Sequence, residues 1–70
     1  MNLELLRKDI KDSGLKVSAL AEKMNLSYQA LYNKMNGKTE FTTSEIADYA
    51  QARGKPLEEV LPIFFENNVD

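Results

Sequence analysis

Side chains that carry amide and phenol groups recur at helical spacing near the middle of the chain. If this segment is helical, four of them share one outer face, namely Tyr28, Gln29, Tyr32 and Asn33, with Lys34 further round. Glutamine and asparagine can bond bidentately to adenine, and tyrosine can contact a thymine methyl group or a phosphate. A solvated helix face usually carries more Glu and Lys, so the chemistry of this face suits the edges of bases in a DNA groove.

Four lysines bracket this face, at Lys16, Lys23, Lys34 and Lys38. Lysine side chains can neutralise phosphates while the end of a helix positions amides against the bases. Together the amides and the lysines predict a surface that enters a groove of DNA. The alternative is a surface helix that is polar by chance.

The chain lacks the residues on which most enzyme and metal sites depend. It contains no His and no Cys, which excludes zinc-thiolate sites, thiol catalysis and the Ser-His-Asp arrangement. The adjacent acids Glu58 and Glu59 point to different faces of a helix and form no catalytic pair. We therefore expect a binding protein and not an enzyme, with no metal, no cofactor and no small-molecule substrate.

The net charge of −2 over 70 residues argues, taken alone, against a nucleic-acid partner. The charge is uneven, however. Residues 1–39 hold seven bases and four acids, a net charge of +3, whereas residues 40–70 hold two bases and seven acids, a net charge of −5. A chain polarised in this way can present a basic face despite an acidic total. The alternative is two ordinary solvated faces.

Membrane and export signals are absent from the sequence pattern. No apolar run approaches the roughly 18 residues that span a bilayer, and the first ten residues lack the continuous apolar segment of a signal peptide. We therefore expect a cytoplasmic location and no membrane partner.

Hydrophobic residues at helical spacing predict five short helices and no strand. The expected helices cover about residues 2–12, 17–24, 28–36, 43–53 and a fifth segment from residue 56 onward. Short helices with short connections make a compact five-helix bundle of the all-α class. The residues expected to face inward are Leu3, Leu6, Ile10, Val17, Leu20, Ala21, Met24, Leu31, Met35, Ile46, Tyr49, Ala50, Leu57, Val60, Leu61 and Phe64.

Polar residues and a proline mark the ends of these helices. Ser27 is a good N-cap for the third helix, after a tight turn at Asn25, a residue type that tolerates the left-handed conformation. Thr42 and Glu45 have the spacing of a capping box before the fourth helix. Pro62 lies inside the fifth pattern and should kink or break that helix.

From residue 14 to residue 61 the chain resembles the Cro/repressor (Xre-type) helix-turn-helix family of phage and bacterial regulators. The resemblance rests on the segments GLKVSALAEKMNLSYQALYNKMNGK, FTTSEIADYA and PLEEVL. It implies a lambda-repressor-like domain with a helix-turn-helix in the second and third helices and the third helix in the major groove of double-stranded DNA. It also implies a small Cro-like transcriptional repressor in a bacterial cell or a phage-infected host.

The resemblance assigns roles to individual positions. The expected base-reading residues are Tyr28, Gln29, Tyr32 and Asn33. The expected phosphate contacts include three of the four bracketing lysines and are Lys16, Ser27, Lys34, Lys38, Thr39, Thr42 and Thr43.

Several positions depart from the family pattern. The second helix begins with Lys16 and Val17 where the family has a hydroxyl or amide residue followed by Gln, so the usual phosphate clamp is absent or replaced by Lys16. Lys34 stands at an apolar position of the third helix, and Met35 is expected to take the packing role. Glu40 lies in the loop that should contact phosphate, where it would repel DNA.

Regulators of this family usually bind palindromic operators as two-fold dimers. The apolar run Ile63, Phe64 and Phe65 is the expected dimer contact, because it cannot all face one small core. We accordingly divide the chain into a DNA-binding domain, residues 1–61, and a C-terminal tail, residues 62–70. The alternative is that all three side chains fold back over the bundle. We expect a homodimer at least on DNA.

The acidic half and the terminal aromatic residues also suit a second hypothesis. The chain could keep a helix-turn-helix fold and act as a protein-interaction module, such as an antirepressor or an adaptor, without strong DNA binding. An electrophoretic shift on random DNA at low salt separates the two hypotheses.

Overall fold

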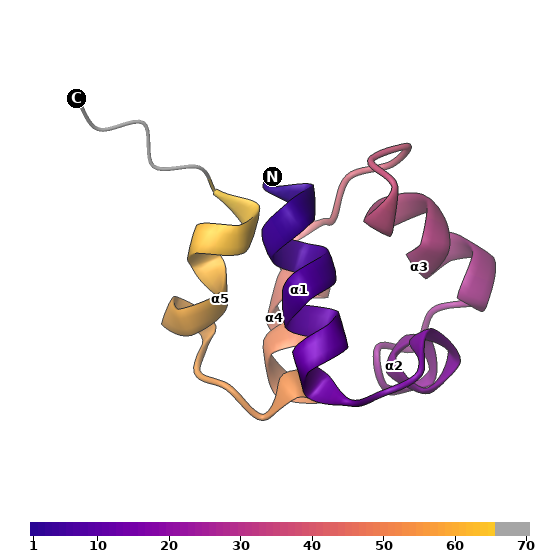
Figure 1. Ribbon diagram of the computed structural model, residues 1–70, viewed down its shortest axis with the longest axis horizontal. Helices are drawn as coiled ribbons and strands as arrows, with labels where there is room; N and C mark the ends of the chain where they lie inside the picture. Colours follow the sequence, from indigo (N-terminus) through magenta and orange to yellow (C-terminus); the bar gives the residue numbers. More distant parts are fainter. Residues whose placement is uncertain (66–70) are drawn as a thin grey trace.

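A computed structural model describes residues 1–65, and in that range the chain forms five α-helices and no strand. The helices are α1 (Leu3–Ser13), α2 (Val17–Lys23), α3 (Tyr28–Met35), α4 (Thr43–Arg53) and α5 (Leu57–Phe64). Figure 1 shows α1 and α4 in the middle of the molecule, with α2 and α3 toward one end and α5 at the other. The predicted all-helical class is confirmed, and the predicted helices begin and end within about one residue of the observed ones.

Side chains cap two of the helices as the sequence predicts. The Ser27 hydroxyl oxygen accepts a hydrogen bond of 3.1 Å from the Ala30 amide at the start of α3. At the start of α4, Thr42 Oγ1 accepts from the Glu45 amide, and Glu45 Oε1 accepts from the Thr42 amide at 2.8 Å. A cap of this kind stabilises a helix by about 1 kcal/mol, because it satisfies amides that have no partner inside the helix.

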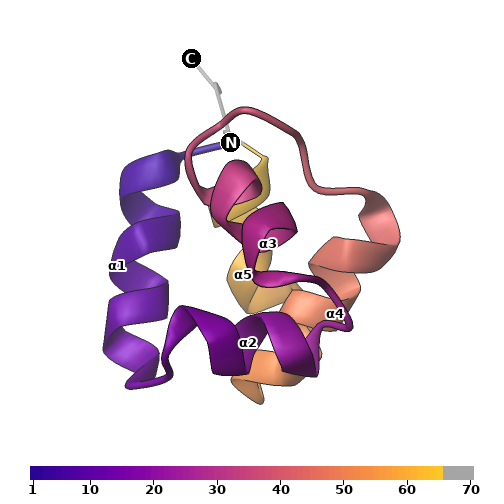
Figure 2. The same cartoon turned by 90° about the vertical axis from the view of Figure 1, so that its right-hand side faces the viewer.

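A tight turn joins α2 to α3. Asn25 takes the left-handed conformation, with a φ of 59°, and the Leu26 amide donates to the Ala21 carbonyl at 2.8 Å. Ala21 is buried, which lets α3 pack closely against α2. Figure 2 shows the result, with α3 lying toward the viewer and α2 below it.

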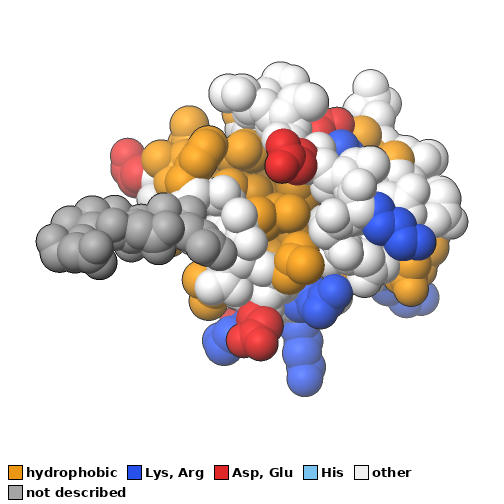
Figure 3. All heavy atoms as spheres, turned by 90° about the horizontal axis from the view of Figure 1, so that it is seen from above, with side chains coloured by type: hydrophobic (Ala, Val, Ile, Leu, Met, Phe, Trp, Pro, Cys, Tyr) orange, Lys and Arg blue, Asp and Glu red, His pale blue; other side chains and the backbone are white. Residues whose placement is uncertain are grey.

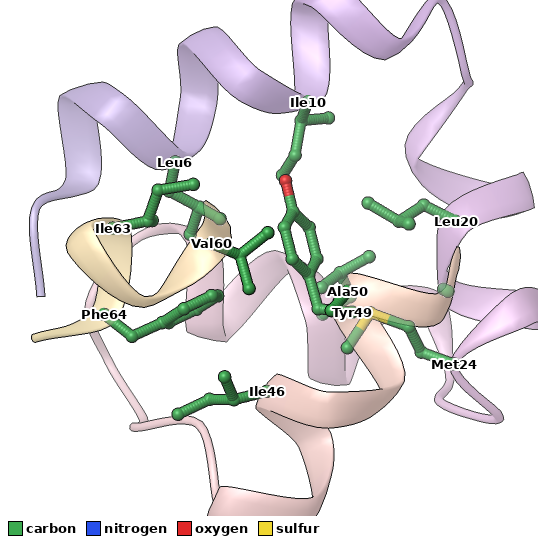
Figure 4. Packing of buried hydrophobic residues seen from close by; sticks show 12 residues of the cluster. Leu6, Ile10, Leu20, Met24, Ile46, Tyr49, Ala50, Val60, Ile63 and Phe64 are labelled. Carbon is green, nitrogen blue, oxygen red and sulfur yellow. The ribbon is translucent and has the colours of Figure 1, made fainter. Parts of the chain in front are cut away.

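The core lies between α1, α4 and α5 and extends to α2 and α3 (Figure 4). Its fully buried side chains are Leu6, Leu20, Leu31, Tyr49 and Val60, each of which contributes roughly 1.5–3 kcal/mol through burial. The sequence predicts slightly more inward-facing residues on α1 and α5 than the structure buries. Leu57 is 46 % exposed at the start of α5, where the helix has only just reached the bundle.

The last helix continues through Pro62 and ends two residues later, at Phe64. Pro62 removes one helical hydrogen bond, the one to the Glu58 carbonyl, but the helix does not break there, so the predicted break at Pro62 is not observed. The end of α5 is also tied to the N-terminus, because the Asn2 amide donates to the Ile63 carbonyl at 2.8 Å. The domain boundary predicted after residue 61 therefore falls inside a helix, and residues 66–70 of the predicted tail lie outside the described part of the chain.

A partly buried carboxylate joins α1 to α4 and to the connection before α5. Asp9 accepts hydrogen bonds from Tyr49 and from Arg53 Nε at 2.9 Å, and it pairs with Lys55 Nζ at 2.9 Å. Burial raises the pKa of the Asp9 carboxyl, but the three hydrogen bonds outweigh this effect and hold its pKa far below the usual range. Burial and the bond to Asp9 raise the pKa of Tyr49 well above the usual value for tyrosine.

Within residues 1–65, no helix combines the length and the hydrophobicity that a membrane span requires.

Candidate nucleic-acid interface

The outward side of α3 presents four polar residues, which we call the α3 face: Tyr28, Gln29, Tyr32 and Asn33. Tyr28 is 51 % and Tyr32 is 44 % exposed, Gln29 is exposed and Asn33 is half-buried. The opposite side of the helix holds Leu31, which is fully buried against the core. The predicted base-reading residues therefore lie together on one accessible surface.

Contacts within the α3 face hold its side chains in place. The rings of Tyr28 and Tyr32 stack with their centroids 5.9 Å apart and an angle of 16° between their planes. One residue further along the helix, Gln29 Nε2 donates to Asn33 Oδ1 at 3.0 Å. These pairs follow from the four-residue spacing, which places side chains one above the other on a helix.

Lys34 does not belong to this surface. Only 9 % of the residue is exposed, and its Nζ donates to the Glu40 carbonyl at 3.0 Å and pairs with Glu45 Oε1 at 3.0 Å. The ammonium group also lies 5.7 Å from the centre of the Phe41 ring, within the range of a cation–π contact. The prediction that Lys34 contacts phosphate is corrected here, because its charge is already used inside the protein.

Glu45, the partner of Lys34, is also held by a second contact, the hydrogen bond from the Thr42 amide. Burial raises the pKa of Glu45, but the amide of Thr42 and the ammonium of Lys34 outweigh burial and lower that pKa overall. Glu45 therefore caps α4 and neutralises Lys34 with the same carboxylate. The family resemblance places an apolar residue at position 34; here the lysine itself takes the inward place, and Met35 is only partly buried.

The loop between α3 and α4 carries the next group of predicted phosphate contacts. Lys38 and Thr39 are exposed, and the Lys38 amide donates to the Asn33 carbonyl at 2.9 Å, so the loop begins directly at the end of α3. Gly37 has a φ of 77°, and a Cβ there would lie 3.1 Å from Leu3 Cδ1. The glycine thus brings the loop against the start of α1.

The other predicted phosphate contacts are accessible. Lys16 lies at the N-cap position of α2, and Thr43 is the first residue of α4; both are exposed. The hydroxyl oxygens of Ser27 and Thr42 accept from backbone amides in the two helix caps. The Ser27 hydroxyl accepts in its cap and keeps its own hydrogen, which can be donated to a phosphate oxygen. Thr42 Oγ1 also lies 3.2 Å from Ser44 Oγ, and the two hydroxyls share a hydrogen bond.

Arg7 is a cation that the sequence pattern did not single out. Its Nη2 donates to Asn36 Oδ1 at 3.1 Å, which brings an exposed guanidinium from α1 to the end of α3. The two residues are 29 positions apart, so only the packing of α1 against α3 reveals this contact. Arginine forms bidentate hydrogen bonds to phosphate more readily than lysine does.

The surroundings of the α3 face contain few acids. The sequence holds no Asp and no Glu from residue 23 to residue 39, a stretch that includes all of α3. Glu58 and Glu59 are exposed on α5, which lies at the opposite end of the molecule (Figure 1). Glu40 remains exposed in the loop that also bears Lys38. The separation of basic and acidic residues along the sequence is therefore partly retained as a separation on the surface of the folded protein.

The predicted dimer residues separate into two groups. Ile63 and Phe64 are both 7 % exposed and pack in the core, so they are not free to form an interface. Phe64 meets Phe41 with a centroid distance of 4.9 Å and Tyr49 with one of 5.5 Å. Phe65 is 58 % exposed and borders a hollow, which we call the apolar hollow, lined by Met1, Glu40, Phe41, Thr43, Ile46, Phe64 and Phe65. Figure 3 shows hydrophobic side chains gathered on this side of the molecule.

No known protein family, curated protein or solved structure matches the chain.

Proposed function

We propose that this protein is a sequence-specific double-stranded DNA-binding repressor of the Cro type. In this proposal α2, the turn at Asn25 and α3 form a helix-turn-helix, and α3 enters the major groove. The observation that carries the proposal is the α3 face, which combines the exposed Gln29 amide, the half-buried Asn33 amide and two exposed phenols and contains no acid. Side chains of this kind match the donor and acceptor pattern of base edges.

Cations around the α3 face supply contacts to the DNA backbone. Lys16, Lys38 and Arg7 are exposed near the start of α2 and the end of α3. Because they neutralise phosphates, they give affinity and register, whereas the α3 face gives sequence preference.

Binding of this kind represses transcription when the operator overlaps a promoter, because the protein then blocks access to it. We further propose that the protein binds a palindromic operator as a dimer. The two copies contact each other through the apolar hollow and Phe65. A two-fold dimer places two copies of α3 about one helical turn of DNA apart, which is the spacing of half-sites in such operators.

The test begins with selection of bound duplexes from a random DNA pool, followed by affinity measurements on the selected duplex. We expect a palindromic duplex whose affinity falls steeply between about 50 and 200 mM salt, because each neutralised phosphate releases counterions. Lys38→Ala should weaken binding to selected and random duplexes about equally, and it should lower the slope of log affinity against log salt by about 0.9 for each bound copy of the protein.

Lys8→Ala is the matched control. Lys8 is also an exposed lysine, but it lines a hollow with Glu59 and Pro62 on the α5 side of α1. This substitution should leave the salt slope unchanged. If the protein retains no duplex even at low salt, the repressor proposal is wrong; co-purification of a protein partner would then favour the interaction-module hypothesis.

A further inference from the structure

The structure points to A·T base pairs as the targets of the α3 face, with Gln29 as the residue that reads adenine and Asn33 as the residue that positions Gln29. This inference rests on the proposed function and specifies it. Three observations support it: the stacking of Tyr28 on Tyr32, the hydrogen bond from Gln29 to Asn33, and the enclosure of Lys34 away from the α3 face.

The bond between Gln29 and Asn33 selects one orientation of the Gln29 amide. Gln29 Nε2 donates one of its two hydrogens to Asn33 Oδ1. The second hydrogen of Nε2 and the acceptor Oε1 remain available for a base. In the major groove, adenine presents an acceptor at N7 and a donor at N6, so a donor and an acceptor on one amide can bond to it bidentately. Asn33 is half-buried, and we assign it to positioning instead of to direct contact with a base.

The charged groups that read the other bases are missing from this surface. Guanine is read most often by arginine or lysine, and cytosine by a carboxylate that accepts from its N4. Lys34 is the only charged residue of α3, and its ammonium group is held by Glu45 and the Glu40 carbonyl. The α3 face therefore has neither a cation for guanine nor an anion for cytosine.

The stacked tyrosines complement a thymine. Their rings lie nearly parallel and about half of each residue is exposed, so together they present apolar ring surface beside the Gln29 amide. Apolar side chains contact the C5 methyl group that distinguishes thymine in the major groove. An adenine read by Gln29 and a neighbouring thymine methyl are both features of A·T pairs.

The experiment measures base preference at single positions of the duplex selected by the wild-type protein. Gln29→Ala identifies the base pair whose preference depends on Gln29, and we expect that pair to be A·T. Replacing its adenine by 7-deazaadenine removes the N7 acceptor and should weaken wild-type binding about tenfold, within the range for a base contact. The same replacement should not affect the Gln29→Ala protein.

Asn33→Ala tests the positioning role. It should reduce the preference at the Gln29-dependent base pair several-fold, and in the double variant with Gln29→Ala it should add nothing further. A residue that only supports folding would weaken binding to every sequence equally and leave the preference ratio unchanged. Gln51→Ala, which changes an exposed amide on α4, is the matched control and should alter neither affinity nor preference.

Each outcome bears on a defined part of the inference. A G·C pair at the Gln29-dependent position, or full binding to 7-deazaadenine, overturns adenine reading while the repressor proposal stands. Additive effects of Gln29→Ala and Asn33→Ala overturn the positioning role of Asn33. A wild-type protein that selects no duplex overturns the proposed function and this inference with it.

Discussion

Lys34 occupies a helix position where the sequence pattern predicts a solvated lysine, yet its ammonium group is enclosed. The four-carbon stem packs as an apolar chain while the charged end finds Glu45, the Glu40 carbonyl and the Phe41 ring. A pair of buried charges can be tolerated only where both remain paired and hydrogen-bonded. Glu45 meets this condition because the Thr42 amide bonds to it as well.

Lys34→Met is the sharpest test at the residue scale. Methionine fills a similar volume but leaves Glu45 without its cation, so we expect the free energy of unfolding to fall by about 2 kcal/mol, measured in urea. The salt slope of DNA binding should stay as in the wild-type protein, because Lys34 contacts no phosphate. A slope that falls by about 0.9 for each bound copy, as for Lys38→Ala, would contradict our placement of this side chain.

Helices α1 and α4 are held together by more than hydrophobic packing. Asp9 receives bonds from Tyr49 and Arg53 of α4 and from Lys55 in the connection to α5. Each of these contacts joins residues at least 40 positions apart along the chain. The carboxylate thus ties α1 to α4 and to the connection before α5, segments that meet only in the folded molecule.

Asp9→Asn should lower the free energy of unfolding by about 3 kcal/mol, because it leaves the cations Arg53 and Lys55 without their carboxylate. Thermal and urea unfolding both measure this change. Asp12→Asn is the matched control: Asp12 pairs with Lys8 on the exposed side of α1, so its loss should cost less than about 0.5 kcal/mol. Equal effects of the two substitutions would contradict the structural role of Asp9.

The low pKa of Asp9 also predicts how stability depends on pH. A carboxyl whose pKa is lower in the folded than in the unfolded protein stabilises the fold fully above the ordinary value, 3.8 for this group. That stabilisation is lost as pH falls from there toward the pKa of the folded state. The difference in stability between the wild-type protein and Asp9→Asn should therefore be constant from pH 5 to 7 and shrink at pH 3. A difference that is unchanged at pH 3 would show that the Asp9 charge is not the cause.

Over the whole molecule, charge is distributed unevenly between the end that holds α3 and the end that holds α5. The α3 face itself carries no acid, although Glu22 and Glu40 are exposed at its end of the molecule, and α5 exposes Glu58 and Glu59 at the other end (Figure 1). A net charge of −2 for the chain therefore does not describe the surface that we propose meets DNA. We expect modest affinity for random DNA, since few cations surround the α3 face.

Phe65→Ser tests the proposed dimer. Because Phe65 borders the apolar hollow and is 58 % exposed, its removal should weaken self-association about tenfold, as judged from the transfer free energy of a phenylalanine side chain. Sedimentation velocity with and without the selected duplex measures this. Leu57→Ser is the control, because Leu57 is similarly exposed but lies outside the hollow. A wild-type protein that stays monomeric both free and on a palindromic duplex would rule out the dimer.

Much of the architecture depends on contacts between residues that are close in the sequence, and these contacts could be predicted from the sequence. The caps at Ser27 and Thr42 and the left-handed turn at Asn25 involve residues within three positions of each other or a single backbone conformation. The α3 face also follows from local periodicity, because a helix places every third or fourth side chain on one side.

The tertiary structure alone decided which of these side chains remain available. The enclosure of Lys34, the bond from Arg7 to Asn36 and the cluster around Asp9 depend on how separate helices pack. So does the division of the apolar run at residues 63–65 into core and surface. Five amphipathic helices, the caps at Ser27 and Thr42 and the polar face of α3 follow from local sequence, because helical hydrogen bonds join residues only four positions apart. Only packing, which joins residues far apart in the chain, decided which charges are paired inside the fold and which remain on the surface.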